Sequence, residues 1–278
     1  MSELPLVSIV TVVKNCAQHI EETIKSVINQ TYSNIEYIII DGASTDGTVD
    51  IIKKYDDHIN YWVSEPDNGI SAAFNKGIGF CRGELIGLIN AGDKYEVAAV
   101  KTVVDNYLYS TGDVFYSDLK IIDEKGEEKY ILEAVKNVTK KTFKYRMPLV
   151  PHPTVFIKSS IYKDELFDEK YQCAMDYDFL RRLIHKNYTF KYVNEPLASM
   201  RFIGKSNIYF EQAKTESYNI SVKFGDSKLI SYFYNIVYMV GKYRVKKKLE
   251  RYRYGRCMLY IYRRIRVLLG WSKWDQVS

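Results

Sequence analysis

A lone carboxylate, Asp93, follows a short apolar stretch and two small residues, Ala91 and Gly92. The apolar stretch, Leu85 to Asn90, is typical of a buried strand in an α/β sheet. Asp93 is then expected at the carboxyl edge, where open α/β sheets bind their ligands. The two small residues leave space for a large ligand or a hydrated metal, and a carboxylate there suits a divalent cation that itself binds a diphosphate. The ordinary alternative is that Asp93 caps the following helix.

Three other predicted strands end in polar segments in a similar way. Val7 to Val13 is a continuous β-branched run, as expected for a central parallel strand. Ile35 to Ile40 reads as a buried strand that runs into a loop rich in Gly, Ser, Thr and Asp, residues 41–48. Tyr61 to Val63 is followed by the segment Ser64-Glu65-Pro66-Asp67-Asn68-Gly69. These patterns place several polar loops at one sheet edge.

Helical spacing of apolar residues separates these strands. Strand and helix alternate four times within about ninety residues, which predicts a doubly wound sheet with right-handed crossovers. After Asp93 the rhythm changes, and an antiparallel return is expected in the second half. The predicted helices cover residues 20–30, a segment that starts near Val49, and residues 70–80, 97–109 and 175–185. The later predicted strands cover residues 114–122, 129–133, 154–157 and 190–193.

Charge is distributed unevenly along the chain. The net charge is +6, but residues 242–274 hold twelve Lys or Arg and one acid, so the rest of the chain is acidic. The four cysteines show no paired spacing, which argues against a zinc site or a disulfide framework and suits a reducing cytoplasm. Met1 to Pro5 shows no signal-peptide pattern, and the apolar run 229–240 is too short to span a bilayer, so we expect a soluble protein.

Seven blocks occur in order along residues 6–207: VSIVTVVKN, SVINQTYSNIEYIIIDGASTDGT, SEPDNGISAAFNKGI, GELIGLINAGD, HPTVF, AMDYDFLRRL and MRFIGKSN. Together they resemble the inverting glycosyltransferases of family 2, of the bacterial surface-polysaccharide type. The resemblance implies an α/β fold of the GT-A class, with a Rossmann-like, mostly parallel sheet flanked by helices. The implied domain covers residues 1–207, with a nucleotide-binding half, 1–95, and an acceptor half, 96–207. Residues 208–278 then form a helical, basic and aromatic C-terminal extension.

The resemblance also implies roles in donor binding. Asp41 matches the carboxylate that accepts a hydrogen bond from the ring NH of uracil or thymine, and Thr11 lies where the base is flanked. Asp67 matches the acid that contacts the nucleoside. Asp93 matches the last carboxylate of the Asp-x-Asp-type motif, which binds Mg²⁺ or Mn²⁺. This chain departs from the family at the preceding position, where Gly92 replaces an acid.

The acceptor side is implied by two later blocks. The family's Glu-Asp pair is Met175-Asp176 here, so the role of general base passes to Asp176 alone. Asp178, two residues further along the expected helix, should face away and serve as a capping or salt-bridge residue. His152 is expected on the acceptor or diphosphate side, and a structural histidine before Pro153 is the alternative.

The extension combines basic residues with Tyr, Trp and Leu after residue 241. An amphipathic helix of this composition is suited to an anionic membrane interface. The alternative is a solvated helix packed on the domain through Leu249, Met258 and Ile265. Nucleic-acid binding is not expected, because no recognised nucleic-acid module accompanies the charge.

The sequence thus predicts an inverting, metal-dependent glycosyltransferase. It would move a sugar from a UDP- or dTDP-sugar to a hydroxyl of a lipid-linked or growing surface glycan, in the cytoplasm at the inner face of the cell membrane. One alternative is a nucleotidyltransferase, but Val13-Lys14-Asn15-Cys16 is not the basic, Gly-rich phosphate loop that such an enzyme needs. The other alternative, suggested by Gly92, is a non-catalytic nucleotide- or membrane-binding module.

Overall fold

The computed structural model describes residues 4–201 and 210–238. The chain divides into two compact units, one of residues 1–137 and 149–204 and one of residues 138–148 and 205–278. The predicted domain boundary at residue 207 falls outside the described residues, so that boundary stays a prediction.

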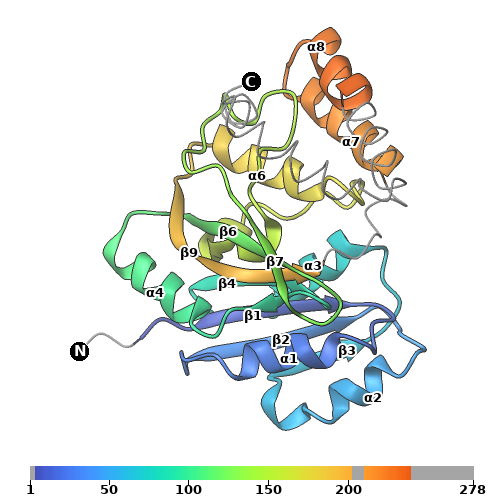
Figure 1. The fold of residues 1–278 in the computed structure, drawn as a ribbon, viewed down its shortest axis with the longest axis vertical. Helices are drawn as coiled ribbons and strands as arrows, with labels where there is room; N and C mark the ends of the chain where they lie inside the picture. Colours follow the sequence, from blue (N-terminus) through green and yellow to red (C-terminus); the bar gives the residue numbers. More distant parts are fainter. Residues whose placement is uncertain (1–3, 202–209, 239–278) are drawn as a thin grey trace. The chain divides into compact units, whose positions relative to one another are not determined.

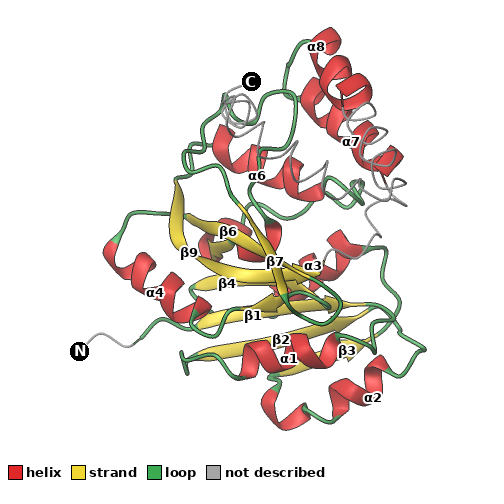
Figure 2. Cartoon of the chain, viewed as in Figure 1, coloured by secondary structure: helices red, strands yellow, loops and turns green. Residues whose placement is uncertain are grey.

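The first unit is an α/β domain in which helices flank one sheet (Figures 1 and 2). Its strands are β1 (Val7–Val13), β2 (Ile35–Asp41), β3 (Tyr61–Ser64), β4 (Leu85–Asn90), β5 (Lys94–Tyr95), β6 (Val114–Ile122), β7 (Glu128–Leu132), β8 (Phe156–Lys158) and β9 (Phe190–Arg201). Its helices are α1 (Ile20–Ile28), α2 (Thr48–Lys53), α3 (Ile70–Gly79), α4 (Ala99–Tyr109), α5 (Ser159–Tyr162) and α6 (Met175–His185), with short 3₁₀ turns η1 (Asp56–His58) and η2 (His152–Thr154).

The sheet is parallel in its first half and mixed in its second. The strand order is β3-β2-β1-β4-β8-β6-β9-β5, and β7 pairs with β6. β3, β2, β1 and β4 are mutually parallel, whereas β8 runs antiparallel to both β4 and β6. Because four neighbouring strands run in the same direction, their carboxyl ends meet at one edge of the sheet. The predicted α/β fold is therefore confirmed, including the change of rhythm after β4.

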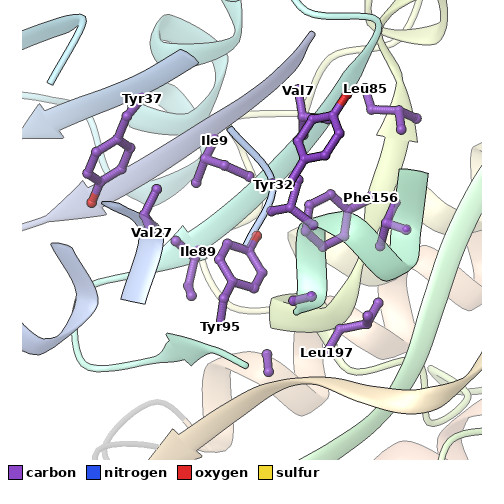
Figure 3. Packing of buried hydrophobic residues seen from close by; sticks show 14 of the residues in the cluster. Val7, Ile9, Val27, Tyr32, Tyr37, Leu85, Ile89, Tyr95, Phe156 and Leu197 are labelled. Atoms are coloured by element: carbon purple, nitrogen blue, oxygen red, sulfur yellow. The ribbon is translucent and has the colours of Figure 1, made fainter. Parts of the chain in front are cut away.

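Helices cover both faces of β1. On one face α1 buries Ile20, Ile24 and Val27 in a core that also contains Ile9. Figure 3 shows Val27 and Ile9 in this core. On the other face α3 approaches so closely that a side chain at Gly77 would overlap Val10. A strand covered on both sides has no polar face, which explains why all seven residues of β1 are buried.

The strand β9 is longer than the sequence predicts. The pattern indicates a strand over 190–193 that stops before Glu195-Pro196, but β9 continues to Arg201. Its parallel pairing with β6 is irregular between Ser117 and Leu119, and Pro196 lies in that irregular part, where the missing N–H removes no regular ladder bond. The end of β9 pairs with the short strand β5, which the sequence did not reveal. β9 thereby reaches the segment directly after Asp93.

The second unit contains the helices α7 (Phe210–Lys223) and α8 (Lys228–Tyr232) and the π-helical turn η4 (Phe233–Tyr238). Within this unit the Tyr145 backbone N–H donates to Asp226 Oδ2 at 2.9 Å, and the rings of Tyr145 and Tyr234 stack with centroids 5.8 Å apart. None of the helices in the described ranges is both long enough and apolar enough to cross a bilayer. The basic helix predicted after residue 241 lies outside the described residues.

Candidate functional site

Asp41 is the last residue of β2, and its side chain is buried. In the sheet register it lies opposite Ser64 of β3. Its carboxylate accepts hydrogen bonds from the Ser44 backbone N–H at 2.9 Å and from the hydroxyls of Ser44 and Ser64 at 2.5 and 2.6 Å. A carboxylate has about four acceptor positions, so these three donors fix its orientation and leave one position unfilled, on a side chain that has no exposed surface.

The loop after β2 is tied to the loop after β1. The Asn15 backbone N–H donates to Ser44 Oγ at 2.7 Å, and Asn15 Oδ1 accepts from the Thr45 N–H at 2.9 Å. The Ala17 N–H donates to Asp46 Oδ2 at 3.0 Å. The Ser, Thr and Asp residues that the sequence places here thus join two loops into one polar surface at the sheet edge.

Asp67 lies against Gly42, the residue that follows Asp41. A Cβ atom at Gly42, the residue after Asp41, would be 2.5 Å from Asp67 Oδ2 and 3.3 Å from Lys14 Cδ. Asp67 Oδ1 accepts the Gly69 N–H at 2.9 Å, which orients the other oxygen toward Gly42. The absence of a side chain at residue 42 therefore allows the Asp67 carboxylate to lie against the residue that follows Asp41.

Thr11 occupies a different environment. It is fully buried, and its Oγ1 lies 3.0 Å from Tyr37 Oη in the core. This hydrogen bond gives Thr11 a role in the packing of β1 against β2. A contact between Thr11 and a nucleotide base stays a prediction, and its burial gives that prediction no support.

Asp93 follows β4 and is 7% exposed. Burial raises its pKa to about 7, opposed by a hydrogen bond from the Asn90 side chain and by the positive charge of Arg201. The alternative of a helix cap is wrong, because β5 follows Asp93 directly and α4 begins only at Ala99, capped by Ala98. Asp93 is therefore a largely desolvated carboxylate, and a bound cation would favour its charged form.

A divalent cation at Asp93 would have few protein ligands. Within residues 4–201 and 210–238, no group of three or more His, Cys, Asp or Glu side chains lies close enough to hold a metal. Asn90 Oδ1 is buried without a hydrogen-bond partner among the described residues, so one carboxylate and one amide oxygen are at hand. These two oxygen donors fit a Mg²⁺- or Mn²⁺-type ion that takes its other ligands from phosphates and water. Gly92 adds no ligand, and its φ of +101° is a conformation that favours glycine.

The turn before β5 is held by two residues that sequence reasoning missed. Arg201 Nη2 donates to both carboxylate oxygens of Glu22 at 2.8 and 2.6 Å, and its Nη1 donates to the Gly92 carbonyl at 3.4 Å. Thr23 Oγ1 donates to the Asp93 carbonyl at 2.7 Å and accepts the Gly92 N–H at 2.9 Å. The only sequence feature that could have pointed to Arg201 is its place in MRFIGKSN, the last of the seven blocks that resemble the family. Thr23 had none, because it stands among the apolar positions of α1.

Asp176 lies in the first turn of α6, and its Oδ1 accepts the Tyr177 backbone N–H at 2.8 Å. Asp178 is fully buried and pairs with Arg182, whose Nε is 2.9 Å from Asp178 Oδ2. The expectation that Asp178 serves in a salt bridge is therefore confirmed. Asp176 is the partly exposed member of the two.

His152 lies in η2, close to Asp176. Both residues line one cavity, and burial lowers the pKa of the His152 imidazole while the negative charge of Asp176 opposes this effect. Its ring packs against Phe74 with centroids 5.1 Å apart. Both expectations for His152, a role on the acceptor or diphosphate side and a structural histidine, stay predictions, although the residue lies near the predicted base.

The structure thus groups the predicted residues by element. Asp41, Asp67 and Asp93 follow three of the parallel strands and so share the carboxyl edge, while Asp176 and His152 line a cavity whose wall includes Leu88 of β4.

Comparisons with known proteins concern the family and the fold. The model of glycosyl transferase family 2 matches residues 8–169. Chondroitin synthase of Escherichia coli is 28% identical over 199 residues, which cover 70% of this chain and 29% of that protein. Two solved structures share the fold: the mannosyltransferase PcManGT of Pyrobaculum calidifontis with GDP-Man and Mn²⁺ (TM-score 0.63, 14% identity, 99% of this chain and 84% of that one), and S. aureus TarS 1–349 with UDP-GlcNAc (TM-score 0.59, 16% identity, 82% and 72%). The likenesses confirm the GT-A fold.

Proposed function

The chain belongs to glycosyl transferase family 2, and we propose that it transfers a sugar from a UDP- or dTDP-sugar to a hydroxyl of a lipid-linked or growing surface glycan. The observation that supports this proposal most is the position of Asp67 against Gly42, the residue after Asp41, at the same edge of the sheet as Asp93, with β1 between β2 and β4. The UDP-GlcNAc and GDP-Man bound in the two similar folds support a nucleotide-sugar donor, and only the first supports uridine.

The base of the nucleotide binds at Asp41. Uracil and thymine both carry a ring N–H between two carbonyl groups, and a fixed carboxylate is the strongest acceptor for such a donor. Ser44 and Ser64 hold the carboxylate in place, so little ordering is needed when the base arrives. Asp67, next to Gly42, contacts the nucleoside.

The departing diphosphate binds near Asp93. A Mg²⁺ or Mn²⁺ ion held by Asp93 and by the Asn90 amide oxygen would act as a Lewis acid that neutralises the diphosphate. The Mn²⁺ in the similar mannosyltransferase complex supports such an ion. Arg201 and Thr23 fix the turn, so that the Asp93 backbone keeps its position as charge develops.

Asp176 is the general base. It removes the proton from the acceptor hydroxyl as that oxygen attacks the sugar, on the face opposite the departing diphosphate, and the configuration at the anomeric carbon is therefore inverted. The first turn of α6 orients it through the Tyr177 N–H, which occupies Oδ1. A general base of this kind contributes about 10²–10⁴-fold to the rate.

The acceptor is a surface glycan or its lipid-linked precursor. The match to a synthase of a polysaccharide supports this class. The basic, aromatic residues 242–274 would hold the enzyme at an anionic membrane surface, at the inner face of the cell membrane, where lipid-linked sugars are found.

The cheapest test is a thermal-shift screen of UDP, dTDP and GDP and their sugar conjugates with Mn²⁺. A ligand at 100 times its Kd adds about 2.7 kcal/mol to the free energy of unfolding, so a specific donor should stand out. We expect a uridine or thymidine diphosphate sugar to raise the Tm most. A larger rise with GDP-sugars would contradict the donor assignment, and binding without turnover would favour the non-catalytic alternative.

A further inference from the structure

A small, partly open cavity is lined by residues of η2, α5, α6 and β4. Its volume is about 20 Å³, enough for one water molecule. Most of its lining is apolar, and the side chains that carry polar atoms are His152, Asp176 and Tyr162. The remaining lining residues are Leu88, Val155, Ile157, Phe167, Phe179 and Leu180.

His152 supplies an unsatisfied polar atom to this region. Its Nε2 is buried and has no hydrogen-bond partner among the described residues. The ring is held between Phe74, at a centroid distance of 5.1 Å, and Phe167, at 6.4 Å. A buried ring nitrogen without a partner costs free energy, so its retention in an apolar wall calls for a partner such as a water molecule.

Asp176 supplies the second polar group. Its Oδ1 accepts the Tyr177 N–H, so its carboxylate plane is already set by the backbone of α6. Its negative charge acts on the His152 imidazole, although His152 Nε2 has no hydrogen-bond partner among the described residues. A gap of one water molecule between a ring nitrogen and a carboxylate agrees with both facts. Tyr162 of α5 is the other titratable group in the lining.

We propose that one water molecule in this cavity links His152 Nε2 to the Asp176 carboxylate, and that His152 is a positioning residue for Asp176. The Nε2–H donates to the water oxygen, and the water donates to Asp176. The link holds the carboxylate in one orientation while its exposed side meets the acceptor hydroxyl. The catalytic meaning of the link rests on the proposed function, whereas the link itself does not.

The consequence for Asp176 is specific. A carboxylate that accepts both the Tyr177 N–H and a buried water is fixed before the acceptor arrives, which lowers the ordering cost of proton transfer. Replacing His152 by Gln keeps a hydrogen-bonding side chain, whereas Phe fills the space and removes the link. In the transfer reaction, His152→Phe should therefore lower kcat with little change in the KM for the donor, and His152→Gln should retain more of the rate.

The link can be tested without any substrate, by NMR titration of the histidine rings. The chain has four histidines, so the His152 signal is identified by its loss in His152→Gln. An adjacent carboxylate favours the protonated imidazole, so Asp176→Asn should move the His152 titration midpoint to lower pH. The exposed His58 is the internal control, and its signal should respond to pH in the same way in Asp176→Asn as in the unaltered protein. Asp164→Asn, which removes an exposed acid, is the matched variant and should leave the His152 midpoint unchanged.

A high-resolution crystal structure of the unaltered chain gives the second readout. We expect one water within hydrogen-bond distance, about 2.7–3.2 Å, of both His152 Nε2 and an Asp176 oxygen. An empty cavity, or a His152 midpoint that Asp176→Asn leaves unchanged, would overturn the proposal. If both readouts succeed but no nucleotide sugar is turned over, the link stands and the proposed function fails.

Discussion

Replacing Asp41 by Asn tests the nucleotide site with little change in shape. Asp41 Oδ1 accepts the Ser44 hydroxyl, and Oδ2 accepts both the Ser44 N–H and the Ser64 hydroxyl. If the new amide nitrogen takes the Oδ1 position, the Ser44 hydroxyl can reverse and accept, so the fold keeps most of its bonds. The charged acceptor for the base is lost in either orientation.

The expected loss of nucleotide affinity follows from that acceptor. Removing the charged partner of a buried donor costs about 1–3 kcal/mol, so the Kd for UDP and dTDP should rise about 5- to 150-fold. Asp41→Ala should cost the same affinity and more stability, because it leaves three donors without an acceptor. Calorimetric titration well below the Tm separates the two effects.

Asp50→Asn is the matched control, because Asp50 is an exposed acid of α2. Its Kd should equal that of the unaltered protein. An unchanged Kd for both UDP and dTDP in Asp41→Asn would remove Asp41 from the binding site and refute the reasoning from the carboxyl edge.

Three further expectations concern other parts of the chain. Asp176→Asn should lower turnover by about 10²-fold or more while nucleotide binding holds, and a crippled Asp178→Asn with an active Asp176→Asn would reverse the assignment. Gly42→Ala should displace the Asp67 carboxylate and weaken UDP binding, with a small change in Tm. The control Gly79→Ala, whose new Cβ would have nothing within 4 Å, should change neither the Kd for UDP nor the Tm. Equal Kd values for the Gly42→Ala and Gly79→Ala variants would argue against a role for the carboxylate next to Gly42. Truncation after Val240 should abolish binding to anionic vesicles, measured by flotation at low salt, and spare donor hydrolysis; full-length protein that ignores such vesicles would contradict the membrane role.

The parallel half of the fold was predictable because its strands are buried on both faces. Val7–Val13 and Ile35–Asp41 are rich in Val and Ile, with only Ser8, Thr11 and Glu36 as polar residues before their last positions, so their ends could be predicted from the sequence. β5 was not predictable, since Lys94–Tyr95 is too short for any period to show. The strand predicted for β9 was too short, because it was ended before Pro196. The irregular pairing that accommodates this proline depends on β6, which is far away in the chain.

The site shows the same division between local and distant information. The ionic role of Asp178 followed from helical spacing alone, since its partner Arg182 is one turn away. Thr11 belongs to β1, one of the strands that end at the carboxyl edge. Its contact with Tyr37 depends on the register between β1 and β2, which no local sequence pattern reveals. The meeting of Gly42 with Asp67 likewise depends on how two loops fold over one edge.

The most direct measurement is release of nucleoside diphosphate from a panel of UDP- and dTDP-sugars by the full-length chain, with Mn²⁺ or with excess chelator. We expect at least one donor to be turned over with Mn²⁺ and none with chelator, and Asp93→Ala to be inactive with its fold intact by circular dichroism. Full activity in excess chelator would contradict the role of Asp93 in metal binding. The absence of release from every donor would contradict the proposed sugar transfer from uridine or thymidine diphosphates.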